Sequence, residues 1–139
     1  MEPLDLTKQP PRSPHEQING LVMMARTVDK LRAALPGGNA GDYRMEGFST
    51  RLLEHLDIQE DDLRAVVALA QSDDDVAAWL RKHTDPARYE AINRLLVNRT
   101  LADLKDRADF ETRYPSAVGL PAQTPLFDVL ERDDALLTR

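Results

Sequence analysis

The chain of 139 residues contains no cysteine. Disulfide bridges, thiolate zinc sites and cysteine nucleophiles are therefore excluded. Aromatic residues make up only 5% of the sequence, so we expect a core built mainly from Leu, Val, Ile, Ala and Met. No apolar run approaches the roughly 20 residues of a membrane-spanning helix, and the N-terminus lacks a basic-then-apolar leader. These two absences predict a cytoplasmic protein.

Positive charge is also in deficit, with 18 Lys and Arg against 24 Asp and Glu and a formal net charge of -6. Nonspecific binding to nucleic acid or to anionic lipid requires clustered Lys and Arg. The sequence therefore predicts neither a nucleic-acid partner nor a membrane partner. Its length fits one domain, and we expect a monomer or a small homo-oligomer.

The distribution of proline and of apolar residues divides the chain into three parts. Residues 1–13 contain Pro3, Pro10 and Pro11, which predicts an extended N-terminal arm. We expect a helical domain over residues 14–114, then a Pro-containing linker and a short C-terminal helix over residues 115–139. Apolar residues recur at helical spacing with no strand alternation. The predicted fold class is all-α: a compact single-domain helical bundle with an extended N-terminal arm.

The first helix has the clearest start signal. Ser13, Pro14 and Glu16 have the form of a capping box with proline at the first helical position. Apolar residues then recur at helical spacing as far as Leu35. We therefore predict a helix from about residue 14 to residue 35, ended by the glycines that follow. We expect it to be central, with the arm folded across it.

Local signals predict shorter helices along the rest of the chain. Their expected starts are Ser49, Gln59, Ser72, Asp85-Pro86, Thr100 and Thr124-Pro125. Acidic residues after Gln59 and Ser72 favour helix starts there, because a carboxylate is stabilised near a helix N-terminus.

The first predicted helix has an unusual polar face. At 100° per residue, Arg32 lies inside the apolar arc and Asp29 lies at its edge. Arg26 and Lys30 lie further round on the same side as Asp29. A charge on an apolar face is costly unless it is paired. Asp29 is three residues from Arg26 and from Arg32, close enough for a local ion-pair cluster.

This polar face has two interpretations. In the first, the cluster holds the N-terminal arm or a neighbouring helix in place. In the second, it forms a pocket for an anionic ligand, because the planar guanidinium suits carboxylate or phosphate. The candidate ligand-binding residues are Arg12, Arg26, Asp29, Lys30 and Tyr43.

No motif in the sequence supports catalysis, a metal site or a cofactor. The three histidines have no zinc-site spacing, and the acidic runs do not fit a calcium-binding loop. The loop over residues 37–41 lacks the Lys and Ser or Thr of a phosphate-binding loop. We therefore name no catalytic residue, metal ligand or cofactor, and the sequence leaves open whether the protein is an enzyme.

Several short motifs occur together in residues 5–80. They are Asp5-Leu6-Thr7-Lys8, Pro11-Arg12-Ser13-Pro14, Gly20, Arg26, Asp29-Lys30, Arg32-Ala33, Tyr43 and the stretch over residues 52–58. In this combination the chain resembles a bacterial family catalogued only as a domain of unknown function. The resemblance fades after residue 80 and implies a small cytoplasmic bacterial protein with no assigned activity.

The resemblance places the family's Arg, Asp and Lys of the first helix at Arg26, Asp29 and Lys30. The chain departs from its relatives after Tyr43, where they tend towards a Cys-Pro-Leu-Asp type run and this sequence has residues 45–48 as Met-Glu-Gly-Phe. We favour a non-catalytic binding or interaction module with an unknown protein partner. The alternative is a protein or enzyme that binds a small anionic metabolite at the polar face of the first helix.

Overall fold

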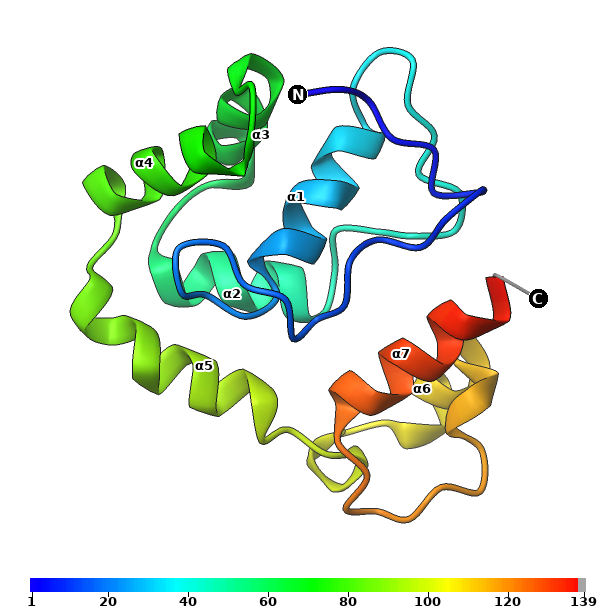
Figure 1. The fold of residues 1–139 in the computed structure, drawn as a ribbon. Coiled ribbons are helices and arrows are strands. Elements are labelled where there is room, and N and C mark those ends of the chain that lie inside the picture. The colour runs from blue at the N-terminus through cyan, green and yellow to red at the C-terminus, as the bar shows by residue number, and fades with distance from the viewer. Residues whose placement is uncertain (138–139) are drawn as a thin grey trace.

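Helix α1, Met24–Ala33, is the central element of the fold (Figure 1). The structure is a computed structural model and describes residues 1–137. Every residue of α1 except Arg32 is buried, which confirms the prediction of a central first helix. A helix buried all round is normally apolar, yet α1 also buries Arg26, Asp29 and Lys30. The surrounding elements must therefore accommodate these three charges.

The other helices lie around α1 (Figure 1). They are α2 (Phe48–Leu56), α3 (Glu60–Leu69), α4 (Asp73–His83), α5 (Tyr89–Val97), α6 (Arg107–Arg113) and α7 (Leu126–Leu137), with short 3-10 turns at Pro86–Arg88, Leu101–Asp103 and Pro115–Ala117. Extended pairing within residues 1–137 is limited to three isolated β-bridges. The all-α class is therefore confirmed.

The predicted start of the first helix at residue 14 is wrong, because α1 begins at Met24. Asn19 and Gly20 both have positive φ, 55° and 80°, and Ile18 and Leu21 exchange backbone hydrogen bonds across them. Asn-Gly is the preferred pair for such a tight two-residue turn. The apolar spacing therefore crosses a turn, and the Ser13 side chain bonds to Glu131 rather than starting a helix.

The N-terminal arm lies along the C-terminal part of α1 and the loop that follows it. Leu6 donates its backbone N–H to Asn39, and Asn39 donates its own to Leu4. The Leu6 side chain is only 1% exposed. The terminal ammonium of Met1 donates to the carbonyls of Val67 and Ala70 in the region of α3. The arm is therefore an integral part of the packed structure.

Helix α7 is longer and more deeply packed than the short final helix that we expected. It has 12 residues, the most of any described helix. Phe127 and Val129 are fully buried, and Leu126 and Leu130 join them in the core. Because α7 packs on the core, it brings the C-terminal part of the chain to the polar face of α1.

Candidate functional site

Arg12 and Asp29, two of the predicted site residues, pair with each other. The Arg12 guanidinium lies 3.0 Å from Asp29 Oδ1, and the Arg12 backbone N–H donates to Oδ2 at 2.8 Å. The same guanidinium also bonds to Asp73 on α4 at 2.6 Å. The hydrogen bond to Asp73 is the largest cause of a raised pKa of Arg12. The charges of Arg12 and Asp29 are therefore paired within the protein, which agrees with the interpretation that this polar face holds the N-terminal arm.

Arg32, the charge inside the predicted apolar arc, also contacts the arm. Its Nε donates to the carbonyl of Glu2 at 2.8 Å, and its guanidinium lies 3.8 Å from Asp29. This side of α1 therefore holds the arm in place.

Arg26 and Tyr43 meet at a partner that the sequence did not suggest. The buried Arg26 guanidinium makes two hydrogen bonds to Asp134 on α7, at 2.6 and 3.1 Å. The Tyr43 hydroxyl donates to the same carboxylate at 2.9 Å, and the guanidinium carbon lies 5.6 Å from the Tyr43 ring centroid. Burial, with Asp134 close by, raises the pKa of Tyr43. The two residues form one buried network that joins α1 to α7.

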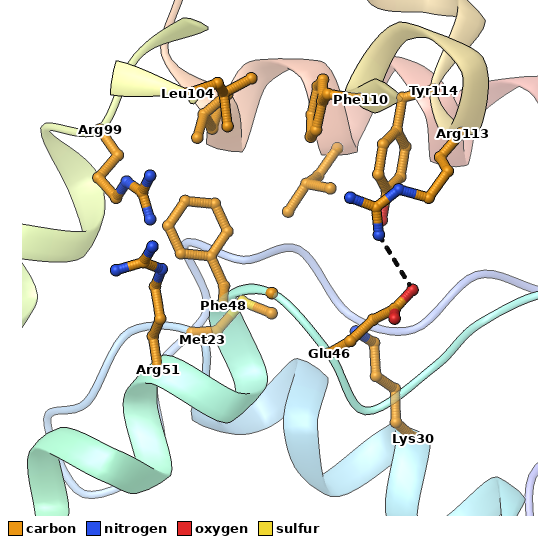
Figure 2. Close-up of a pocket in the computed structure, with 13 residues that line it drawn as sticks. Met23, Lys30, Glu46, Phe48, Arg51, Arg99, Leu104, Phe110, Arg113 and Tyr114 are labelled. Atoms are coloured by element: carbon orange, nitrogen blue, oxygen red, sulfur yellow. Dashed lines mark hydrogen bonds and ion pairs between the residues drawn. The ribbon is translucent and has the colours of Figure 1, made fainter. Parts of the chain in front are cut away.

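Lys30 has a different environment, a cavity of about 220 Å³ between α1, α2, α6 and α7. We call this cavity the Lys30 pocket (Figure 2). Its charged side chains are Lys30, Glu46, Arg51, Arg99 and Arg113. Four cations therefore face a single carboxylate, in a protein whose net charge is negative.

The Lys30 ammonium has no hydrogen bond or ion pair within residues 1–137, although the residue is only 9% exposed. Its side chain extends from α1 towards Glu46 (Figure 2). Burial, reinforced by the nearby Arg26, lowers the pKa of Lys30 to about 8, while Asp134 and Glu46 act in the opposite direction. Lys30 Nζ is not among the fully buried side-chain atoms that lack a partner, which in the described residues are Arg26 Nε and Ser116 Oγ. The ammonium therefore keeps some contact with solvent through the pocket, and a bound anion would stabilise it.

Arg51 and Arg99 face each other at the other side of the pocket, beside the Phe48 ring (Figure 2). Neither guanidinium has a hydrogen bond or ion pair in the described part of the chain. Burial, and secondly the charge of Arg51, lower the pKa of Arg99. The Arg99 guanidinium lies 6.0 Å from the Phe48 ring centroid. Arg51 is exposed and Arg99 is partly exposed, so both guanidinium groups are available to an anion that enters the pocket.

The remaining lining combines a polar entrance with apolar walls. Arg113 lies 3.3 Å from Glu46, and both side chains are about half exposed, so the pocket reaches solvent there. The aromatic residues Phe48, Phe110 and Tyr114 line the interior, and burial raises the pKa of Tyr114. The arrangement suits a small ligand that has an anionic group and a flat apolar part.

Of the five residues predicted from the sequence, only Lys30 lines this pocket. Arg51, Arg99, Arg113 and Glu46 were not predicted. Arg51 lies on α2 and Arg113 lies on α6, whereas Arg99 follows α5 and Glu46 precedes α2. No spacing rule connects residues so far apart in the chain. Glu46 alone could have been noticed, because it lies in the segment where the chain departs from its relatives.

Within residues 1–137, no group of three or more His, Asp or Glu side chains is placed to hold a metal ion. None of the helices in this range combines the length and the apolar character needed to cross a membrane.

Comparison with known proteins places most of the described chain in one family. The profile of a family described as "Domain of unknown function (DUF5069)" matches residues 8–135. The similarity therefore does not fade after residue 80, as the sequence motifs predicted, but continues to residue 135 and includes Asp134 on α7. No curated protein matches the chain.

Proposed function

The chain belongs to the DUF5069 family of domains of unknown function, and on this premise we propose that it binds a small organic anion in the Lys30 pocket. The observation that carries the proposal is the convergence of Lys30, Arg51 and Arg99 on one cavity without an acidic partner. Charge-assisted hydrogen bonds to carboxylate or phosphate are about twice as strong as neutral ones. A bound anion would relieve the repulsion between these cations.

The geometry favours a ligand over a protein partner as the occupant of this site. The cations line a small cavity with aromatic walls that opens to solvent beside Arg113 and Glu46, whereas a protein interface needs an extended surface of much larger area. The alternative that the sequence offered, a small anionic ligand, is therefore the one we adopt. We place the site in the Lys30 pocket rather than at the Arg12–Asp29 pair. A bacterial cytoplasm is the setting we propose.

Calorimetric titration of the full chain with benzoate and with phenyl phosphate tests this proposal. Each probe combines one anionic group with one aromatic ring, and we expect saturable binding with Kd near 1 mM or tighter, which corresponds to about -4 kcal/mol. Substitution of Arg51→Gln or Arg99→Gln removes a charged donor worth about 1.5–3 kcal/mol. The Kd should therefore rise about ten- to a hundredfold.

Arg64→Gln is the matched control, because Arg64 pairs with Glu60 on the outer face of α3 and lines no part of the pocket. It should bind both probes as the wild type does. If neither probe binds at millimolar concentration, or if Arg51→Gln and Arg99→Gln bind as tightly as Arg64→Gln, the proposal is wrong.

A further inference from the structure

Lys30 is the only lysine that lines the pocket, and it differs from the other lysines of the chain. Lys8, Lys82 and Lys105 are exposed, whereas Lys30 is buried. Its amine lies in a cavity large enough for a small molecule and has no hydrogen-bond acceptor within residues 1–137. The amine is therefore held by the fold but available to a molecule that enters the cavity.

Burial, and secondly the charge of Arg26, lower the pKa of Lys30, whereas the carboxylates of Asp134 and Glu46 raise it. Arg26, four residues earlier on α1, is a buried cation that forms an ion pair with Asp134. Glu46 is likewise paired, with Arg113, and the other charges facing the cavity are the cations Arg51 and Arg99. With a pKa of about 8, about a tenth of the Lys30 amine is neutral at pH 7. A neutral amine in a cavity can act as a nucleophile.

The two ends of the pocket differ in chemistry. Lys30 and Glu46 lie on one side of the Phe48 ring, and Arg51 and Arg99 lie on the other (Figure 2). A ligand whose anionic group is bound by the two arginines would extend past the Phe48 ring towards the side of the pocket on which Lys30 lies (Figure 2). The aromatic walls between the two ends suit a flat spacer.

We propose that Lys30 forms an imine with a small aldehyde or ketone that carries a carboxylate or phosphate at its far end. The inference rests on the proposed function, because it requires that Arg51 and Arg99 hold the anionic group. It adds the substrate class, a carbonyl compound, and the reacting atom, Lys30 Nζ.

The step is balanced without any further reactant. The lone pair of the neutral Lys30 amine forms a bond to the carbonyl carbon, and the C–O π electrons move to oxygen. Two protons pass in turn from the nitrogen to that oxygen, and the oxygen leaves as water. The products are the C=N double bond of the imine and one water molecule.

Reductive trapping of the full chain tests this inference. The probe is 4-formylbenzoate, in which a benzene ring separates an aldehyde from a carboxylate, and sodium cyanoborohydride reduces any imine to a stable secondary amine. Peptide mapping by mass spectrometry should show that Lys30 is modified at least about tenfold faster than Lys82 at neutral pH. The reason is that the lowered pKa of Lys30 gives its amine a larger neutral fraction. The exposed lysines in the same molecule serve as internal references.

Two comparisons link the reaction to the pocket. Benzaldehyde has the aldehyde but no carboxylate, so it should modify Lys30 more slowly than 4-formylbenzoate does. Arg99→Gln should reduce modification by 4-formylbenzoate to the rate seen with benzaldehyde, and an excess of benzoate should have the same effect on the wild type. Arg64→Gln should not change the rate.

The outcomes separate this inference from the proposed function. If benzoate binds in the calorimeter but Lys30 is modified no faster than Lys82, the inference is wrong and the proposed function stands. If Lys30 is modified rapidly but equally by both aldehydes and in Arg99→Gln, the inferred role of the arginines is wrong. Failure of both benzoate and phenyl phosphate to bind contradicts the proposed function itself.

Discussion

Among single residues, Lys30 and Arg12 show how the position of a charge decides its role. Arg12 has two carboxylate partners, Asp29 and Asp73, so its charge stabilises the packing of the arm. Lys30 is also buried on α1, at 9% exposure, but faces a cavity and has no hydrogen bond or ion pair among residues 1–137. The first charge is satisfied by the fold, whereas the second is left available for a ligand.

The Lys30 charge should lower stability at neutral pH. Its pKa is lowered from 10.5 to about 8 in the folded protein. Between these values the unfolded chain binds more protons, so the free energy of unfolding should rise with pH from about 8 to about 10.5. Lys30→Met removes the buried charge. We expect this variant to be more stable than the wild type at pH 7, by up to about 3 kcal/mol.

Urea denaturation at several pH values measures this difference. The advantage of Lys30→Met should shrink as the pH rises above about 8. Lys82→Met is the control, because Lys82 is exposed, and its stability should track that of the wild type throughout. If Lys30→Met is the less stable protein at pH 7, the ammonium contributes to stability and our view of its environment is wrong.

At the scale of elements, the segment before α1 shows how a distant side chain sets a helix start. Asn93 on α5 accepts a hydrogen bond from the backbone N–H of Val22 at 3.0 Å and donates to the carbonyl of Gly20 at 2.8 Å. Asn19 on the same turn donates to the Tyr89 hydroxyl. The turn is therefore held by α5, and α1 begins only after it, at Met24.

Asn93→Ala should loosen this turn. It leaves the Val22 N–H and the Gly20 carbonyl without their side-chain partner, at a cost of about 1–3 kcal/mol. Hydrogen exchange should become faster at the amides of residues 21–23, with smaller changes in α3. Asn98→Ala is the matched control, because the Asn98 side chain has no hydrogen bond among the described residues. Unchanged exchange at residues 21–23 would show that Asn93 does not hold the turn.

At the scale of the whole molecule, the Arg26–Asp134 pair joins the first helix, α1, to the last helix, α7. The two residues are 108 positions apart, and their side chains are 2% and 10% exposed. Removing one partner of a buried ion pair leaves an uncompensated charge. Leu126 and Leu130 of the same helix, α7, also line the Lys30 pocket.

Loss of either partner should therefore destabilise the entire protein. For Arg26→Met and for Asp134→Ala we expect the free energy of unfolding to fall by about 3–5 kcal/mol. The double variant Arg26→Met with Asp134→Leu should recover much of the loss, because two apolar side chains replace the pair. Arg64→Gln, which breaks an exposed pair, should change stability by about 1 kcal/mol or less. A loss below that value in Arg26→Met would show that the pair is not a structural link.

The sequence by itself determined the all-α class and several helix starts. Helices predicted near Ser49, Gln59 and Ser72 begin at Phe48, Glu60 and Asp73. These predictions succeeded because apolar spacing and acidic first turns are local signals. The sequence also determined that the first helix would carry charges at costly positions.

Only the tertiary structure decided what satisfies those charges. It paired Asp29 with Arg12 and Arg26 with Asp134, and it left Lys30 in a cavity with Arg51 and Arg99. It also delayed the start of the first helix to Met24, after a turn held by Asn93. Each of these outcomes depends on contacts between residues far apart in the chain. Helical periodicity describes only neighbours within a turn or two, so it cannot specify such contacts.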